Sequence, residues 1–441
     1  MLFFIFIASF IDYCFCYQYH HHHFKSLSTS SSTLSLSSSS STLSSSTLSS
    51  STSSSTLSSS TSSSTLSSST SSSFIFTTCQ AGVEKILKEE IIRNHPEFKF
   101  AFSKKGLLTF KVINEDINPS IKIKSIFSKR YGKSIGIKTY EEIIMIAKNY
   151  SEIYKQKMKL HCFSRELGGM RSEHPDFIKD RVAYVNSFKK KLLTNDDIFL
   201  KENDNNDNEN NYINNDEIVF DVIVGENDEE KLFCGIHTES RNTFPGGIIP
   251  LILPAESPSR AWLKIEEAAQ FVQTIYPDFS FKTGDIAIEI GSAPGGACYS
   301  LLNKGLEVYG VDPLPPDRQH APILKKNKKF HEIRGTLQSV TRAQLPSTCN
   351  WLLMDANISP YESLEKLILI CNHYKDSLKG FFYTIKLNDD LWMKEKSLLD
   401  YIDELEGTMK KEIESCEEIV FKQLTSNRKE ILCFLKFKNS I

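Results

Sequence analysis

Three glycines and a proline between two apolar stretches are the residues that point most directly to ligand-binding chemistry. Residues 285–313 read DIAIEIGSAPGGACYSLLNKGLEVYGVDP. Gly291, Gly295 and Gly296 allow a sharp backbone turn and the close approach of a ligand, because no Cβ stands in the way. Asp312 ends the apolar stretch that follows. In doubly wound sheets such a turn binds an anionic group at a helix N-terminus, and such a carboxylate binds ribose hydroxyls.

The spacing of the turn differs from that of the dinucleotide-binding fingerprint. The glycines follow the pattern G-x-x-x-G-G, with Pro294 before the pair, and not G-x-G-x-x-G. A proline-containing turn suits a cofactor without a pyrophosphate, such as S-adenosylmethionine. A plain turn between a strand and a helix is the alternative interpretation.

Hydrophobic periodicity predicts the elements that hold this turn. Asp285–Ile290 alternates and is rich in Ile, as in a buried strand. The helix Ala297–Lys304 follows and is stopped by Gly305, and Leu306–Val311 is the next strand.

The rest of the chain continues the alternation of strands and helices. We predict strands at Phe330–Ile333, Asn350–Met354, Gly380–Ile385, Glu418–Phe421 and Glu430–Phe437, and helices at Leu364–Tyr374 and Trp392–Glu406. This alternation predicts an α/β fold with a parallel sheet. An antiparallel final strand would mark the methyltransferase variant of that architecture.

Four charged residues stand at the ends or starts of these elements. Asp355, Lys386 and Glu430 lie at strand ends or starts, and Lys264 lies on a helix that precedes the sheet. A lone lysine at a strand end is usually a solvated residue. Four charges at such points beside a cofactor turn favour a catalytic site instead.

The N-terminal part of the chain contains a basic region. Between Lys104 and Asn195 there are 20 Lys and Arg against 9 Asp and Glu, a balance of +11, although the whole chain has a net charge of −2. Such a region is typical of modules that meet phosphate backbones, and a lysine-rich solvated surface is the alternative. We expect a small α+β module here, with a strand from Phe74, an amphipathic helix, a hairpin and a helix at Tyr140–Lys159.

The first helix of this module should bury one face. Its apolar residues Val83, Ile86, Leu87 and Ile91 recur at helical spacing. The hairpin is expected at Phe98–Phe102 and Leu107–Val112, and two further strands at Ile218–Val224 and Lys231–Ile236.

Composition divides the chain into four segments. Residues 1–73 contain an apolar start and a Ser/Thr/Leu tract that cannot bury enough apolar surface to order. Residues 74–245 form the basic α+β region, with an Asn/Asp-rich insertion at 201–217. Residues 246–257 are a Pro/Gly-rich linker, and residues 258–441 form the α/β domain.

Several features of composition bear on the compartment and on metals. The apolar Met1–Tyr17 segment lacks the basic start and the small-residue cleavage site of a signal peptide, and it is short for a membrane span. The tract His20–His23 could bind a metal but is more typical of low-complexity sequence. The ten cysteines form no C-x-x-C pair, which favours reduced intracellular thiols over a zinc site or disulfides.

Six motifs together resemble the FtsJ-like RNA ribose 2′-O-methyltransferases, and most closely the RlmM subgroup that modifies large-subunit ribosomal RNA. They are PSRAWLKIEEA, EIGSAPGGACYSLL, VYGVDP, WLLMDANISP, FYTIKL and NRKEILCFL. The resemblance covers Pro258 to the C-terminus. It extends more weakly over TTCQAGVEKILKEE and IHTESRNTFPGGIIPLILPAESPSR.

The resemblance implies roles for individual residues. The family's K-D-K-E catalytic tetrad maps onto Lys264, Asp355, Lys386 and Glu430. It implies that Lys386 takes the proton from the ribose hydroxyl while Lys264 supplies a neighbouring cation.

The resemblance also implies a cofactor, S-adenosylmethionine, and the residues that bind it. Ala293, Pro294, Gly295 and Gly296 would hold its methionine end, together with Gly291 in the same turn. Asp312 would contact its ribose. Asp355 would lie near its methyl group.

Other implications concern the N-terminal region and two departures from the subgroup. The subgroup carries a ferredoxin-like plus THUMP RNA-binding region, which matches the basic module.

Ala261 replaces a small hydroxyl residue before the first catalytic lysine. Thr336 stands where the subgroup has an acidic residue near the adenine, so cofactor affinity is in question at both positions.

We therefore predict a Rossmann-like methyltransferase domain preceded by a ferredoxin-like/THUMP-like α+β region. The expected substrate is RNA, and first of all large-subunit ribosomal RNA. Transfer or messenger RNA is the alternative substrate, and a non-catalytic RNA-binding or ribosome-assembly factor is the alternative function. We expect no metal and no membrane partner. The expected compartment is intracellular, with the cytoplasm first and the nucleus or mitochondrion as alternatives.

Overall fold

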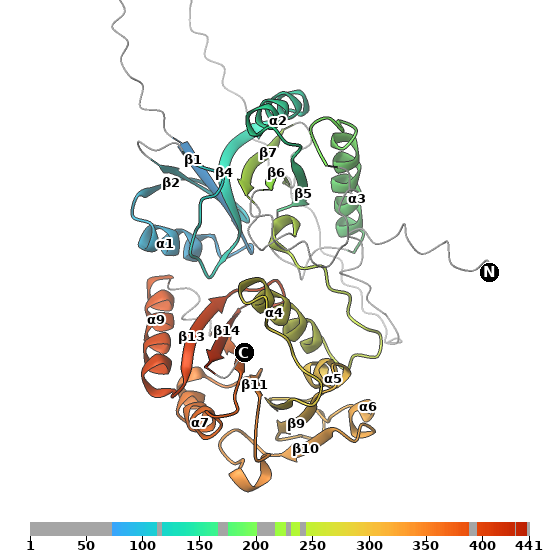
Figure 1. The fold of residues 1–441 in the computed structure, drawn as a ribbon, viewed down its shortest axis with the longest axis vertical. Coiled ribbons are helices and arrows are strands. Elements are labelled where there is room, and N and C mark those ends of the chain that lie inside the picture. Colours follow the sequence, from blue (N-terminus) through green and yellow to red (C-terminus); the bar gives the residue numbers. More distant parts are fainter. Residues whose placement is uncertain are drawn as a thin grey trace, which may run out of the picture. The chain divides into compact units, whose positions relative to one another are not determined.

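The computed structural model describes residues 73–112, 117–165, 175–200, 217–225, 231–238, 244–387, 395–427 and 429–438. These residues form two seven-stranded sheets with helices packed on them (Figure 1). None of the described helices is long and apolar enough to cross a membrane. The predictions for residues 1–72 and for the insertion from 201 to 216 lie outside the described residues, and the proposed domain boundaries stay predictions.

The second sheet contains the strands that follow residue 285. Its strands are β8 (Ile286–Ile290), β9 (Glu307–Asp312), β10 (Phe330–Arg334), β11 (Trp351–Met354), β12 (Gly380–Lys386), β13 (Cys416–Lys422) and β14 (Glu430–Phe437). Their order is β10-β9-β8-β11-β12-β14-β13. The first five strands of this sheet are parallel, and β14 is antiparallel to both of its neighbours. The predicted parallel α/β sheet is confirmed, and the antiparallel final strand is the mark of the methyltransferase variant.

Helices cover both faces of this sheet, as buried parallel strands require. On one face lie α4 (Ala261–Ile275) and α5 (Gly296–Asn303), whose apolar side chains cluster with alternate residues of the strands. On the other face lie α7 (Pro360–His373) and α9 (Glu395–Glu412). A short helix, α6 (Pro322–Lys325), precedes β10. Figure 1 shows α7 and α9 on the opposite side of the strands from α4 and α5.

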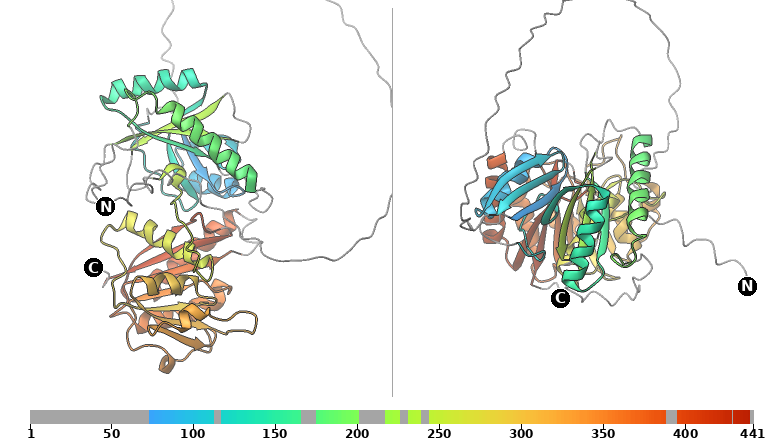
Figure 2. Two further views of the ribbon diagram at one scale, coloured as in Figure 1. Left: turned by 90° about the vertical axis from the view of Figure 1, so that its right-hand side faces the viewer. Right: turned by 90° about the horizontal axis from the view of Figure 1, so that it is seen from above.

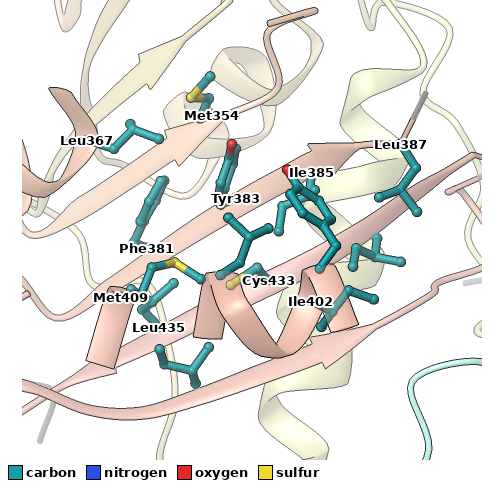
Figure 3. Close-up of a cluster of buried hydrophobic side chains, with 14 of the residues drawn as sticks. Met354, Leu367, Phe381, Tyr383, Ile385, Leu387, Ile402, Met409, Cys433 and Leu435 are labelled. Atoms are coloured by element: carbon teal, nitrogen blue, oxygen red, sulfur yellow. The ribbon is translucent and has the colours of Figure 1, made fainter. Parts of the chain in front are cut away.

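The core under α7 and α9 is built from the alternate side chains of three neighbouring strands. Figure 3 shows Phe381, Tyr383 and Ile385 of β12 beside Cys433 and Leu435 of β14. Leu367 of α7, Ile402 and Met409 of α9 and Met354 of β11 complete this part of the cluster. Because side chains alternate along a strand, the register that buries these residues also fixes which residues emerge at the strand ends.

The first sheet contains β1 (Ser73–Cys79), β2 (Phe98–Lys104), β3 (Leu107–Val112), β4 (Ser128–Lys138), β5 (Lys159–Ser164), β6 (Ile218–Val224) and β7 (Leu232–Thr238). Their order is β2-β3-β1-β4-β7-β6-β5, so the α+β region is one continuous sheet. Its helices are α1 (Glu84–Asn94), α2 (Tyr140–Tyr154) and α3 (Pro175–Leu192). The predicted hairpin and amphipathic helix are confirmed, and the ferredoxin-like/THUMP-like assignment stays a prediction.

The predicted helix at 140–159 is five residues too long. It begins as expected, with Thr139 and Glu142 forming a capping box. It ends at Tyr154 because Lys155 adopts the left-handed conformation, with φ of 53°. The backbone then extends, and Lys159 begins β5.

The three helices of this region pack on one face of the first sheet. Strand register places Ile75, Ile236, Phe220 and Leu160 on that face, one from each of β1, β7, β6 and β5. The helix α1 covers the part around Ile75, and α2 and α3 cover the part around the other three residues. Both figures show α2 and α3 side by side (Figures 1 and 2).

A buried charge network lies on the opposite face of this sheet. Asp221 of β6 accepts a hydrogen bond from His237 of β7, with 2.6 Å between Oδ2 and Nδ1. Arg130 Nη1 donates to the other ring nitrogen of His237, Nε2, over 3.1 Å. Since Nε2 is an acceptor, Nδ1 carries the proton, and the imidazole links a guanidinium to a carboxylate.

His161 of β5 completes this network. Its Nδ1 lies 3.7 Å from Asp221 Oδ1. Ligand atoms of His161, Asp221 and His237 lie within 4.8 Å of one another, a spacing that a metal ion could use. His237, however, has both nitrogens engaged and Arg130 beside it, so the geometry is that of a charge network and not of a vacant ligand set.

Burial sets the protonation of this network. It lowers the pKa of His161 to about 4, so the ring is neutral at physiological pH. Burial would also raise the pKa of Asp221, but His237, His161 and Arg130 outweigh it and hold that pKa well below its ordinary value.

The network predicts a pH dependence of stability. Because the folded-state pKa of His161 is depressed, its contribution to the free energy of unfolding is present above pH 6.5 and is lost as the pH falls toward 4. The loss should reach about 2 kcal/mol at pH 5. Urea unfolding followed by circular dichroism at pH 7 and pH 5 should show this loss in the wild type and much less of it in His161→Gln. The exposed His331→Gln variant is the control, and equal losses in all three proteins would contradict the assignment.

Candidate active site

Four charged side chains from four elements meet at one edge of the second sheet. Lys264 lies on α4, Asp355 follows β11, Lys386 ends β12 and Glu430 begins β14. Lys386 and Glu430 are direct partners in the antiparallel pairing of β12 and β14. Because β11 and β12 run parallel as neighbours, their carboxyl ends bring Asp355 and Lys386 to the same place. The structure thus brings together all four residues that the resemblance singled out.

Each lysine bridges both carboxylates, so the four side chains form a closed ring. Lys264 Nζ lies 2.9 Å from Asp355 Oδ2 and 2.8 Å from Glu430 Oε2. Lys386 Nζ lies 2.5 Å from Asp355 Oδ1 and 2.6 Å from Glu430 Oε1. We call these four residues the charge ring. Its two positive and two negative charges balance.

The charge ring sets the protonation of two of its members. Burial disfavours the charged form of Lys264, but Asp355 and Glu430 outweigh burial and raise the pKa of Lys264 above its ordinary value. Burial likewise opposes the charged form of Glu430, but Lys264 and Lys386 outweigh it and lower the pKa of Glu430. At neutral pH Lys264 is therefore a fixed cation and Glu430 a fixed anion.

The glycine turn between β8 and α5 is tight for reasons internal to the protein. Gly291 and Gly295 have φ values of 80° and 111°, which side chains rarely adopt. An added Cβ at Gly291 would lie 2.7 Å from Cα of Ala356, and one at Gly295 would lie 2.0 Å from Leu324 Cδ1. A Cβ at Gly296 would collide as well. These glycines are required by the turn and by its packing, a reason beyond the room for a ligand that the sequence suggested.

The middle of the turn is the part that a ligand can reach. Ala293 and Pro294, joined by a cis peptide bond, are partly exposed. The turn also adjoins the charge ring, because the Asp355 N–H donates to the carbonyl of Ile290, the residue before Gly291, over 3.1 Å. The turn and the charge ring are therefore neighbouring parts of one site.

Asp312, at the end of β9, ties that strand to the turn. Its buried carboxylate accepts hydrogen bonds from the Ala293 N–H at 3.2 Å and the Leu314 N–H at 2.9 Å. Arg318 Nη2 also donates to it, over 3.1 Å. A ribose contact at Asp312, as the resemblance implies, therefore requires the half-exposed Arg318 side chain to move aside.

The sequence prediction missed a second support of the turn. Ser292 Oγ lies 2.7 Å from His320 Nε2, and His320 Nδ1 lies 2.8 Å from Glu332 Oε2. Ser292 and His320 are buried, and Lys325 Nζ pairs with Glu332 at 3.1 Å. The chain gives no local signal for this relay, because its members come from three separate segments.

Glu289, the last but one residue of β8, was also missed. It accepts a hydrogen bond from Cys298 Sγ, with 2.7 Å between the heavy atoms. Burial raises the pKa of Glu289 to about 8, and the negative charges of Asp355 and Asp312 add to the shift. The carboxyl is thus largely protonated at neutral pH, and it holds the first turn of α5 without adding a charge to the site.

The two positions that depart from the subgroup lie where the motifs place them. Ala261 is the first residue of α4, and its N–H donates a hydrogen bond to Ser259 Oγ over 3.3 Å. Thr336 follows β10 and donates its N–H to Ser339 Oγ over 2.8 Å. The effect of either residue on cofactor affinity stays a prediction.

The strand order and the site define the class of this domain. A parallel sheet with an antiparallel strand inserted beside its last parallel strand, and a glycine turn after the first strand, is the methyltransferase variant of the Rossmann-like fold. Residues 258–379 match the model of the family described as FtsJ-like methyltransferase. This match agrees with the resemblance to the FtsJ-like methyltransferases that the motifs carry.

Curated relatives carry the name ribosomal RNA large subunit methyltransferase M. The protein from Marinomonas sp. is 32% identical over 142 residues, which cover 31% of this chain and 38% of that protein. The protein from Saccharophagus degradans is 26% identical over 204 residues, 42% of this chain and 50% of that protein. The chain thus matches half or less of the length of these relatives.

Solved structures show only distant likeness. A putative ribosomal RNA methyltransferase of Plasmodium falciparum is 16% identical and covers 41% of this chain and 97% of its own, with a TM-score of 0.29. Fibrillarin from Aeropyrum pernix, in complex with S-adenosyl-L-methionine, is 14% identical and covers 46% and 89%, with a TM-score of 0.30. At these scores the likenesses support no inference about function.

The relay behind the turn predicts a selective loss of cofactor binding. His320→Gln cannot bridge Ser292 and Glu332 at once, so the turn should loosen and affinity for S-adenosylhomocysteine should fall about 10-fold. Calorimetric titration measures the affinity, and hydrogen exchange of the turn amides should rise in parallel. His373→Gln, at the solvent-facing end of α7, is the control. An unchanged affinity with an unchanged turn would show that the relay is only a local contact.

Arg318 and Asp312 should affect the same ligand in opposite directions. If ribose hydroxyls bind Asp312, then Arg318→Ala removes a competing, half-exposed partner of that carboxylate and should tighten S-adenosylhomocysteine binding about 2- to 5-fold. Asp312→Ala should weaken it, because the turn loses its acceptor as well. Titration of both variants decides the point. Weaker binding in Arg318→Ala would mean that Arg318 itself contacts the ligand and that the ribose contact lies elsewhere.

Proposed function

We propose that this protein transfers a methyl group from S-adenosylmethionine to a ribose 2′-hydroxyl of RNA, with large-subunit ribosomal RNA as the substrate. The observation that carries the proposal is the charge ring beside the glycine turn. A turn that can hold the methionine end of a cofactor adjoins two lysines and two carboxylates that can accept and transfer a proton. The family match and the names of the curated relatives support the same reaction.

The residues of the glycine turn and Asp312 fit the cofactor. The accessible Ala293 and Pro294 and the N-terminal turn of α5 offer a place for a carboxylate, and Asp312 offers an acceptor for ribose hydroxyls. When bound, S-adenosylmethionine supplies an electrophilic methyl group on a good leaving group. The protein therefore has to position the acceptor oxygen and remove its proton.

In the proposed mechanism Lys386 removes that proton. A lysine acts as a base only when its neutral form is accessible, and a neighbouring fixed cation favours loss of its proton. Lys264, whose pKa is raised by Asp355 and Glu430, is that cation. Asp355 and Glu430 each contact both ammonium groups, so they hold Lys386 in one orientation toward the hydroxyl.

The N-terminal region supplies the affinity for RNA in this proposal. Its ferredoxin-like/THUMP-like assignment and its excess of 11 positive charges between Lys104 and Asn195 fit a partner with a phosphate backbone. A ribose must leave its stack to reach a site at a sheet edge, which favours single-stranded loops as targets. We also propose an intracellular location, because the proposed substrate is ribosomal RNA.

Two alternatives remain distinct from this proposal. A transfer or messenger RNA substrate would use the same chemistry. A non-catalytic ribosome-assembly factor would bind RNA, with or without the cofactor, and transfer no methyl group, and the intact charge ring argues against it. Total RNA as substrate separates the three outcomes in one assay.

The proposal predicts labelling of RNA that depends on Lys386. Tritiated methyl transfer from S-adenosylmethionine to total RNA should label large-subunit ribosomal RNA. Lys386→Ala should reduce the rate about 100-fold or more, because the base is lost, while affinity for S-adenosylhomocysteine stays within about 2-fold. Lys328→Ala, an exposed lysine of the same domain, is the control and should transfer at the wild-type rate.

The other outcomes point elsewhere. Label in small RNAs would identify transfer RNA as the substrate in place of ribosomal RNA. Absence of label despite bound cofactor would favour the non-catalytic factor. Loss of cofactor binding together with transfer in Lys386→Ala would show that Lys386 belongs to the binding site.

A further inference from the structure

One corner of the first sheet carries aromatic and basic side chains on the face opposite its helices. Strand register aligns Lys99 of β2, Lys111 of β3 and Phe74 of β1 in one row across three strands. The next row contains Phe102, Thr109 and Phe76. Paired residues of antiparallel strands point to the same face, and so do residues two apart in one strand. Both rows therefore lie on one face.

A β-bulge brings Phe102 onto this face. Phe100 pairs with Phe110 and Phe102 pairs with Thr109, so the register shifts between them. Phe110 lies on the face covered by α1, whereas Thr109 lies on the other face. The bulge thus separates two nearby phenylalanines onto opposite faces of the sheet.

The rings on this face are exposed to solvent. Phe74 is 38% exposed and Phe102 43% exposed, although phenylalanine is a residue that folding usually buries. Phe76, in the same face, is fully buried because Gly132 and Gly235 leave room for its ring, and an added Cβ at Gly235 would lie 2.1 Å from it. Phe76 thus packs down onto the sheet, whereas Phe74 and Phe102 stay open to solvent.

The charges on this corner have one sign. The strands β1, β2 and β3 contain Lys99, Lys104 and Lys111 and no acidic residue. Lys104 pairs with Leu107, two residues before Thr109, so all three lysines share the face of Phe74 and Phe102. These three strands therefore combine flat apolar rings with cations and contribute no acidic side chain of their own.

We infer that this face of β1, β2 and β3 is a docking platform for single-stranded RNA, in which Phe74 and Phe102 stack on bases and Lys99 and Lys111 pair with phosphates. Aromatic rings stack on any base, while lysines follow the backbone without regard to sequence. Bases in a duplex are already stacked on each other and cannot use the rings. The inference rests on the proposed function for its choice of partner, because it names the surface by which the N-terminal region holds the RNA.

Phe100 provides a matched comparison on the same strand. It is 38% exposed, like Phe74, but it lies on the face of α1, where Lys88 Nζ sits 4.1 Å from its ring centroid. Its ring also packs edge-on against Phe110. Phe100 therefore has a role within the fold, and its replacement should cost stability without cost to RNA binding.

The test is fluorescence anisotropy of the full chain with a labelled single-stranded oligoribonucleotide of mixed sequence, over a range of salt concentrations. Phe74→Ala with Phe102→Ala should weaken binding at least about 10-fold and leave the salt dependence unchanged, because stacking carries no charge. Lys99→Gln with Lys111→Gln should reduce the slope of log affinity against log salt by about 1.4. Phe100→Ala with Lys88→Gln is the control and should bind as the wild type does. Thermal melting of each variant checks that it is folded.

Three results would overturn the inference. Equal affinity of the Phe74/Phe102 variant and the wild type would exclude stacking at this face. Equal weakening by the Phe100/Lys88 control would show that the loss reflects folding alone. A change in oligomeric state with unchanged RNA affinity would assign the face to contact between copies of the chain.

The same experiment separates this inference from the proposed reaction. RNA binding and methyl transfer are measured independently, and the platform variants should bind S-adenosylhomocysteine as the wild type does. If the wild type transfers the methyl group and the platform variants bind RNA as the wild type does, the proposed reaction is supported and the platform is rejected. If the platform variants lose RNA affinity but the wild type transfers no methyl group, the platform is supported and the proposed reaction is rejected.

Discussion

The mutual neutralisation of Lys264, Asp355, Lys386 and Glu430 is the constraint on which the candidate active site depends. Taking a single charge out of water is costly, and a buried ion pair repays that cost only with good geometry. In the charge ring every charge has two opposite partners at 2.5–2.9 Å. Loss of one member would leave a net charge at the site. The ring therefore requires α4, β11, β12 and β14 to be in place together, and a slip of β14 by one residue would turn Glu430 to the other face of the sheet.

Three acids near this edge have different surroundings. Asp355 is neutralised by two lysines, and Asp312 is held by two backbone N–H groups and Arg318. Glu289 has no cation beside it and is buried, so its pKa rises to about 8. An uncharged Glu289 between two carboxylates avoids repulsion among three negative charges. The site thus presents carboxylates only where they meet a cation or a hydrogen-bond donor.

Sequence reasoning recovered the parts of this site that are encoded locally. The turn between β8 and α5 was predictable because glycines and a proline interrupt a strand-to-helix change of period, and β14 was predicted at its observed bounds. The four members of the charge ring were singled out by their positions at strand ends and on the preceding helix, and the family resemblance gave each its implied role. The spacing from Lys264 to Glu430 alone does not show that they meet. The relay of Ser292, His320 and Glu332 was not predictable, because it depends on tertiary contacts among three segments. The end of α2 was misplaced because a lysine took the left-handed conformation that usually signals glycine.

The two sheets use different surfaces because their strands pair differently. Parallel strands joined by helices are covered on both faces, so the second sheet can present chemistry only at the edge where its strands end. Most pairings of the first sheet are antiparallel, and α1, α2 and α3 lie on one face, while the other face carries the charge network, Phe76 and the exposed corner. An edge suits a reaction that must place one oxygen within a fraction of an ångström, while an open face suits a long, flexible polymer held by many weak contacts. The proposed recognition by a face and the proposed catalysis at an edge are therefore both consistent with strand direction.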